Sequence, residues 1–109
     1  GLEKFGGYEI DFEGRRLFHN GRELELTQKE FELAAFMLQN SGRLLSRTEL
    51  LEKVWGIAAE VDTRTVDTHV SRIRKKLGLN PENGWRLIPV YGYGYRLEAA
   101  EGRLSSQSA

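Results

Sequence analysis

The hydrophobic residues of segment 64–77 are spaced as on one face of an α-helix. Val66, Val70, Ile73 and Leu77 follow one another at intervals of four, three and four residues, which places them on one stripe of a helix. The opposite side carries mainly Arg, Lys, Ser and Thr. The pattern predicts an amphipathic helix whose apolar stripe is buried and whose basic side faces solvent.

Two earlier segments, about residues 28–40 and 47–55, also have helical patterning. Each begins with a capping box, in which a Ser or Thr and a Glu three residues later each bond the other's backbone amide. The residues that fit the start of a helix are Thr27 with Glu30, Ser46 with Glu49, and Thr63 or Thr65 for the third helix.

The segments before the first helix and after the third have the alternation of β-strands. Together with the dipeptide Asn20-Gly21, the alternation predicts a small antiparallel sheet over about residues 5–26. Two glycines between β-prone segments predict a hairpin over about residues 85–97. The small, polar residues 98–109 are expected to form a disordered tail.

The order of these elements predicts an α+β domain over residues 1–97. It consists of an N-terminal antiparallel sheet, a three-helix core and a C-terminal β-hairpin. A helix, a turn and a second helix with a basic outer side form a helix-turn-helix, and a hairpin behind the second helix adds a wing. The predicted fold is therefore a winged helix-turn-helix, and a basic helix of this kind suits the major groove of DNA.

The composition is that of an ordinary globular protein, with 39% hydrophobic and 29% charged residues. The chain has no cysteine, which excludes disulfides and thiolate metal sites and fits a reducing compartment. No apolar run approaches the roughly 18 residues that a membrane span needs. No paired carboxylates, Ser/His/Asp set, metal-ligand spacing or Gly-rich phosphate loop is present, so we expect neither an enzyme nor a metal or cofactor.

The net charge of zero conceals an asymmetry along the chain. Residues 1–62 contain 8 Lys and Arg against 12 Asp and Glu, whereas residues 63–109 contain 8 against 4. Within residues 63–77, five basic residues accompany a single acid, Asp67. Such a local positive field can engage phosphates. For this segment taken alone, an ordinary surface helix with solvated charges is the alternative.

Several motifs together identify a family resemblance. The most specific is the long run R-T-V-D-T-H-V-S-R-I-R-K-K-L of residues 64–77. The others are L-T-Q-K-E-F-E-L (26–33), N-S-G-R-L-L-S-R-T-E-L-L (40–51), V-W-G (54–56) and G-Y-G-Y-R-L (92–97). These motifs resemble the OmpR/PhoB-type winged-helix domain of bacterial response regulators, and the resemblance covers about residues 8–97.

The resemblance implies a sequence-specific double-stranded DNA-binding domain, the output part of a two-component regulator of transcription in the bacterial cytoplasm. Such domains normally follow a receiver domain that carries the phospho-accepting aspartate, so we expect a receiver ahead of Gly1, outside this chain. Attachment to a transmembrane sensor instead is the alternative. The resemblance also implies binding to direct-repeat promoter sites as head-to-tail dimers.

The resemblance further divides the DNA-facing residues into two sets. Base contacts are implied for Asp67, Thr68, Ser71 and Arg72. Phosphate contacts are implied for Arg47, Trp55, Arg64, Thr65, His69, Arg74, Lys75 and Tyr95. The guanidinium of Arg72 suits the O6 and N7 acceptors of guanine, the carboxylate of Asp67 suits the cytosine amino group, and Thr68 suits a thymine methyl.

Structural roles compete with DNA contact at four of these positions. Asp67 is alternatively a helix-cap carboxylate that orients Arg64, and Arg74 is alternatively the partner of an acid in the sheet half. Trp55 is expected to lie mostly in the core, with only its indole N–H free for phosphate. His69 is alternatively a plain surface histidine, because no second ligand at metal spacing accompanies it.

The wing tip departs from the family pattern. Relatives usually have threonine-valine-arginine-glycine, whereas this chain has Pro89-Val90-Tyr91-Gly92, followed by Tyr93. Pro89 lacks both the hydroxyl and the N–H, and Tyr91 replaces the arginine that can enter the minor groove. We therefore expect a weak minor-groove contact, a weaker A·T preference there, and greater reliance on Arg72.

Protein partners are also suggested by the pattern. The loop after the second helix matches the segment that contacts RNA polymerase in activators of the family, and its residues are Ile57, Ala58, Ala59, Glu60 and Val61. Packing of this apolar loop on its own domain is the alternative. Docking of an acidic protein on the basic helix is a second class of function, although protein interfaces are richer in apolar anchors than that face is.

Overall fold

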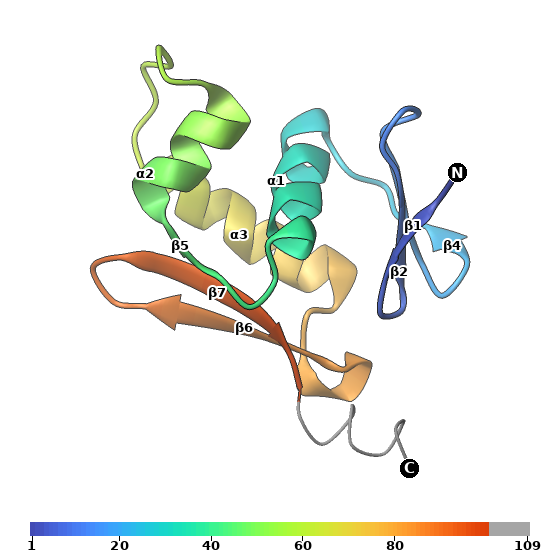
Figure 1. Cartoon of the computed structure of the whole chain (residues 1–109). Helices are drawn as coiled ribbons and strands as arrows, with labels where there is room; N and C mark the ends of the chain where they lie inside the picture. The colour runs from blue at the N-terminus through green and yellow to red at the C-terminus, as the bar shows by residue number, and fades with distance from the viewer. Residues whose placement is uncertain (101–109) are drawn as a thin grey trace.

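The computed structural model describes residues 1–100 (Figure 1). The first element of the domain is a four-stranded antiparallel sheet. Its strands are β1 (Glu3–Phe5), β2 (Tyr8–Asp11), β3 (Arg16–His19) and β4 (Arg22–Glu23), in that spatial order. Tyr8 and Ile10 alternate with half-buried residues of β2 and are fully buried. The predicted extension of the sheet to residue 26 is wrong: β4 ends at Glu23, and Leu24 and Leu26 beyond it pack on the core.

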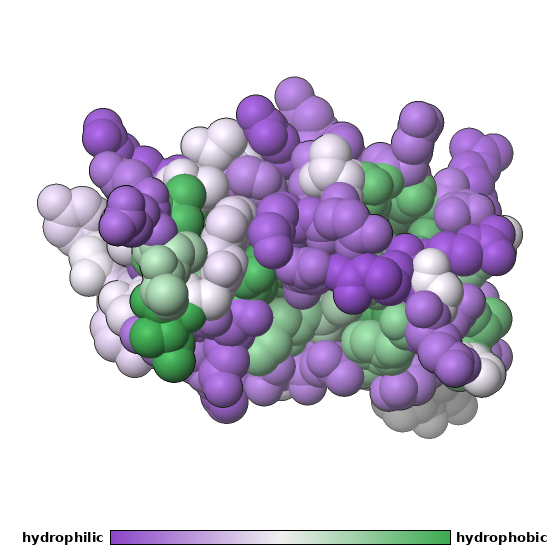
Figure 2. Space-filling model, turned by 90° about the horizontal axis from the view of Figure 1, so that it is seen from above, coloured by the Kyte–Doolittle hydropathy of each residue, from purple (hydrophilic) through white to green (hydrophobic). Residues whose placement is uncertain are grey.

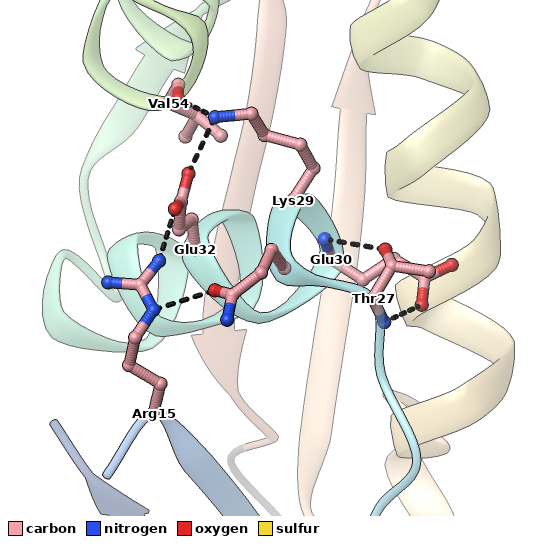
Figure 3. Close-up of polar contacts among 7 residues, drawn as sticks. Arg15, Thr27, Lys29, Glu30, Glu32 and Val54 are labelled. Atoms are coloured by element: carbon pink, nitrogen blue, oxygen red, sulfur yellow. Dashed lines mark hydrogen bonds and ion pairs between the residues drawn. The ribbon is translucent and has the colours of Figure 1, made fainter. Parts of the chain in front are cut away.

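Helix α1 (Gln28–Gln39) begins at the predicted capping box. Thr27 accepts from the Glu30 amide at 3.2 Å, and the Glu30 carboxylate accepts from the Thr27 amide at 2.9 Å (Figure 3). Both bonds satisfy amides that would otherwise lack partners at the helix start. The predicted start of this helix is confirmed.

The second helix differs from the prediction over residues 47–55. It is α-helical only in α2 (Arg47–Leu50) and continues as a wider π-helical turn, η1 (Leu51–Trp55). Ser46 accepts from the Glu49 amide at 2.9 Å. The Glu49 carboxylate instead pairs with Arg43, so only half of the second predicted capping box forms.

A second sheet, of three strands, contains the wing. Its strands are β5 (Leu44–Ser46), β6 (Trp85–Val90) and β7 (Gly94–Ala99), in the order β5-β7-β6, and a 3-10 turn, η2 (Pro81–Asn83), precedes β6. Strand β5 was not predicted, because three residues are too few to show alternation. A Cβ at Gly94 would lie 1.9 Å from the Leu45 carbonyl oxygen, so glycine lets β5 approach the start of β7.

The wing continues further than predicted. Strand β7 includes Glu98 and Ala99, and Ala100 is buried. The predicted tail therefore begins too early, because its first three residues complete the hairpin and pack on the domain. The remainder of that predicted tail, residues 101–109, lies outside the described residues.

The core is centred on the contact between α1 and α3 (Arg64–Leu77). The predicted stripe of Val66, Val70, Ile73 and Leu77 is buried. The hydroxyl of Tyr8 donates to the Leu77 carbonyl at 2.5 Å, which joins the first sheet to the end of α3, and burial raises the pKa of Tyr8 to about 12. Within residues 1–100, no helix has the length and apolar character to span a bilayer.

A network of charged groups joins the first sheet to the helices (Figure 3). Arg15, in the turn before β3, pairs with Glu32 and donates to Gln28 at 2.6 Å. Lys29 reaches Glu32 at 3.0 Å and the Val54 carbonyl of η1 at 3.1 Å. The network thus fixes α1 between the sheet and the helix-turn-helix.

Candidate nucleic-acid interface

The outward side of α3 carries exposed polar and basic side chains. They are Arg64, Thr68, Ser71, Arg72, Arg74, Lys75 and Lys76. No ion pair links Arg72, Arg74 or Lys75 to an acid within residues 1–100. Three cations of one helix that have no acidic partner in the described part of the chain leave their donors available for an anionic ligand.

The start of α3 is capped by a residue that was not predicted. The Asp62 carboxylate accepts from the Arg64 amide at 2.8 Å, and Thr63 makes no side-chain cap bond. The predicted capping by Thr63 or Thr65 is therefore wrong; Thr65 instead donates its amide to the Asp62 carbonyl at 2.9 Å. The Arg64 amide and guanidinium hold the pKa of Asp62 below its ordinary value.

Arg64 pairs with Asp62 at 3.1 Å but remains largely solvent-exposed. Exposed pairs of this kind are weak and easily exchanged. The alternative role of Asp67, in which it orients Arg64, is wrong, because the Arg64 guanidinium pairs with Asp62. Arg64 can still turn toward a phosphate.

The carboxylate of Asp67 lies where α2, α3 and the wing meet. Its Oδ1 accepts from Nε of Arg47 at 2.8 Å and from the hydroxyl of Tyr95. The Arg47 guanidinium also lies over the Tyr95 ring, 5.2 Å from its centroid. We call Arg47, Asp67 and Tyr95 the three-element cluster. It joins two predicted phosphate contacts to a predicted base contact.

His69 and Trp55 form a second contact between the helices. Their rings meet edge to face with centroids 4.9 Å apart, and Nδ1 of His69 donates to the Thr65 carbonyl at 2.8 Å. Trp55 is half-buried against the core, which confirms its predicted packing role. Contact of either ring with phosphate stays a prediction.

The C-terminal half of α3 borders two shallow hollows. One is lined by Ser71, Arg74, Lys75, Leu79 and Asn80. The other, between α3 and the wing, is lined by Asp67, Val70, Ser71, Arg74, Leu87, Pro89 and Tyr95. Arg74 borders both and pairs with no acid of the sheet within residues 1–100, so the alternative role predicted for it is wrong.

Lys76, for which no role was predicted, connects α3 to α1. Its ammonium lies 2.7 Å from a Glu30 carboxylate oxygen. The Glu30 side chain is only 2% exposed. Burial disfavours the charged form of Glu30, but the bonds from Lys76 and Thr27 outweigh burial and lower its pKa. The pair joins the end of α3 to the start of α1.

The wing tip is uncharged and exposed. Tyr91 is fully exposed and Tyr93 about half exposed, and Gly92 takes a left-handed φ of 73° in the turn. No charged residue lies between Leu87 and Tyr95. The tip thus offers aromatic rings and no cation to a ligand.

The loop between η1 and α3 projects from the top of Figure 1. Ile57 is 85% exposed, and Ala58 and Glu60 are exposed as well. The predicted alternative, that this loop packs on its own domain, is wrong at Ile57. Seen from that side, hydrophilic side chains cover most of the surface and hydrophobic ones gather in separate patches (Figure 2).

Comparison with known proteins places this geometry in a family. Residues 21–97 match the model described as transcriptional regulatory protein, C terminal. The chain is 39% identical to the sensory transduction protein RegX3 of Mycobacterium leprae over 99 residues, 91% of this chain and 50% of that relative. The chain therefore spans about half the length of this curated relative.

Solved structures agree with the sequence relatives. The response regulator DrrB of Thermotoga maritima, described as an OmpR/PhoB homologue, superposes with a TM-score of 0.75 at 35% identity, over 91% of this chain and 45% of DrrB. The RstA DNA-binding domain of Klebsiella pneumoniae, in complex with the RstA box, superposes with a TM-score of 0.74 at 28% identity, over 89% of this chain and 96% of that domain. The winged-helix assignment is confirmed.

Proposed function

The chain belongs to the family of C-terminal domains of transcriptional regulatory proteins, and we propose that it binds specific double-stranded DNA through α3 and the wing. Domains of this family are non-enzymatic. One observation carries the proposal: Arg72, Arg74 and Lys75 lie on the exposed side of α3 without acidic partners in residues 1–100. A duplex supplies phosphates and guanine acceptors for such groups.

Arg72 is the main base reader in this proposal. It is exposed near the middle of α3, and a guanidinium can bond both O6 and N7 of one guanine. Thr68 donates its hydroxyl to the Arg64 carbonyl at 3.1 Å, which leaves its methyl group for a thymine methyl. Ser71, exposed one turn further along, contributes a hydroxyl to an adjacent base.

Phosphate contacts set the position of α3 on the duplex. Arg64 and Lys75 lie near its two ends, and Arg74 borders the hollow beside the wing. Arg47, Trp55, Thr65, His69 and Tyr95 extend this set. Phosphate contacts fix register and salt dependence, whereas base contacts carry the sequence preference.

The whole protein is proposed to be a bacterial two-component response regulator acting in the cytoplasm. The length of RegX3 and DrrB beyond the matched part supports a further domain, and a receiver fits that role. Binding as head-to-tail dimers on direct repeats follows from the same family resemblance. The exposed loop around Ile57 supports contact with RNA polymerase in an activator.

Selection of binding sites from a random duplex library tests the proposal. We expect enrichment of one half-site, repeated in the same direction, and measurable binding of the selected duplex by fluorescence anisotropy. Arg22→Ala, on the exposed β4 away from α3, is the matched control and should bind as the wild type does. Recovery of no enriched sequence would contradict the proposal.

A further inference from the structure

We propose that Asp67 is a positioning residue, which holds α2 and the wing against the first turn of the DNA-reading helix. The inference rests on the proposed DNA binding and assigns Asp67 a role other than reading a base. Three elements far apart in the chain meet at its Oδ1, which accepts from Arg47 of α2 and from Tyr95 of β7. Removing this one oxygen therefore frees two elements at once.

Burial shows that the three-element cluster is built into the domain. Tyr95 is 8% exposed, and the side chains of Arg47 and Asp67 are 25% and 37% exposed. Charge-assisted bonds in such partly dry surroundings are stronger than those on an open surface. Burial and the Asp67 carboxylate also raise the pKa of Tyr95, so its hydroxyl keeps its proton and remains a donor.

Backbone contacts make the wing sensitive to this cluster. The Arg47 amide donates to the Tyr93 carbonyl at 2.9 Å, one residue before β7. Leu45 and Tyr95 are direct partners in the β5–β7 ladder. A shift of the Arg47 side chain is therefore coupled to the beginning of α2 and to the turn of the wing.

The direction in which DNA affinity changes when Asp67 is removed distinguishes a positioning role from a purely electrostatic effect of its charge. Asp67 is the only acid within α3, so its negative charge repels phosphates. If charge alone mattered, its removal would strengthen binding and steepen the salt dependence. If Asp67 positions Arg47 and the wing, its removal weakens binding and flattens the salt dependence, because phosphate contacts are lost.

The first experiment measures affinity for the selected duplex at several salt concentrations. Asp67→Ala should bind about tenfold more weakly, with a salt slope lower by about one to two, at 0.9 per lost phosphate contact. Asp67→Asn keeps an oxygen that accepts from both donors and should recover much of the affinity. Asp62→Asn, which removes a charge beside α3 outside the cluster, should bind as tightly as wild type or more tightly. Tighter binding by Asp67→Ala would overturn the proposal.

Single-base variants of the duplex distinguish positioning from base reading. With Asp67→Ala, affinity should fall by a similar factor on every variant, so discrimination at each base pair is kept. Loss of discrimination at one C·G pair alone would overturn the proposal in favour of a cytosine contact. Tyr95→Phe, which lacks only the donor, should weaken binding, and adding it to Asp67→Ala should cause little further loss. Additive losses would contradict a shared cluster.

Hydrogen exchange of the free domain tests the cluster without DNA. The Arg47 amide, bonded to the wing, should exchange faster in Asp67→Ala, while the amide of Phe31 in α1 should exchange at the wild-type rate. Unchanged exchange at Arg47 would overturn the proposal even if DNA binding falls. If the selection yields no duplex that the wild type binds, but exchange of the Arg47 amide is still faster in Asp67→Ala, the proposed DNA binding is contradicted. The positioning of the wing by Asp67 is then still supported.

Discussion

The first half of the chain and helix α3 use their cations differently. Five basic side chains of the first half pair with carboxylates: Arg15 and Lys29 with Glu32, Arg16 with Glu23, Arg43 with Glu49, and Arg47 with Asp67 of α3. In α3, Arg64 and Lys76 have acidic partners, whereas Arg72, Arg74 and Lys75 have none within residues 1–100. A zero net charge thus combines a first half whose cations are largely paired with a helix that has three cations available to an anion.

Packing explains which cations of α3 are paired. Asp62 precedes the helix and Glu30 belongs to the buried start of α1, so both acidic partners come from outside α3. The buried pair of Lys76 with Glu30 holds structure together, whereas the cations of α3 without acidic partners in residues 1–100 are free to exchange water for phosphate. The difference indicates that partner geometry, more than the number of charges, identifies a nucleic-acid surface.

The largest expected effect is the salt dependence of DNA binding. About four neutralised phosphates correspond to a slope near −3.6, so affinity should fall by about two orders of magnitude between 50 and 200 mM salt. Fluorescence anisotropy with the selected duplex measures it. Lys75→Ala should lower the slope by about one, whereas Arg16→Ala should leave it unchanged. Equal slopes for all three proteins would remove the distinction between paired and unpaired cations.

Arg72→Ala should cost about 1–3 kcal/mol on the selected duplex and relax the preference at one base pair. The reason is loss of a two-pronged bond to guanine that no phosphate contact replaces. Titrations against the selected duplex and a scrambled duplex measure both effects. An equal loss of affinity on the two duplexes would make Arg72 a phosphate contact.

Lys76→Ala should lower the free energy of unfolding by about 1–2 kcal/mol at neutral pH, because it leaves the buried Glu30 carboxylate without its cation. The folded-state pKa of Glu30 lies below its ordinary value. The pair therefore stabilises the fold at neutral pH, and this contribution is lost as the pH falls through that lowered pKa. Denaturant unfolding at several pH values measures it; a difference between the two proteins that persists in acid would contradict the assignment.

The smallest expected effect is that of Arg16→Ala. Its pair with Glu23 is exposed on both sides, so solvent replaces the interaction and the midpoint of thermal unfolding should hardly change. Differential scanning calorimetry measures that midpoint. A large decrease would show that the surface pairs of the first sheet stabilise the fold as the buried Glu30 pair does.

Much of the fold could be predicted from local patterns. The stripe from Val66 to Leu77 and the capping box of Thr27 depend only on residues within a turn of each other. The bounds of α3 agree with the predicted range, and α1 ends one residue earlier than predicted. Strand β5 and the π-helical turn η1 were not predicted. Strand β5 exists only by pairing with β7, and η1 is a change of helix width within one apolar pattern.

The residues of the candidate site also divide into those that local spacing predicts and those that depend on distant partners. Arg72, Arg74 and Lys75 could be predicted because an exposed basic side follows directly from helical spacing. Asp67 could not be assigned, because its partners are 20 residues before it and 28 after it. Local spacing offered only a base contact or a role in orienting Arg64, and Arg64 pairs with Asp62 instead.

By itself, the sequence determined the kinds of element, their order, the exposed basic side of α3 and the family resemblance, because these depend on periodicity and on short motifs. Only the tertiary structure decided which charges are paired. Glu30 meets Lys76 across 46 residues, and Asp67 joins Arg47 to Tyr95. Such partners are chosen by the packing of the helices and the wing, and their identity separates the cations that hold the domain together from those available to DNA.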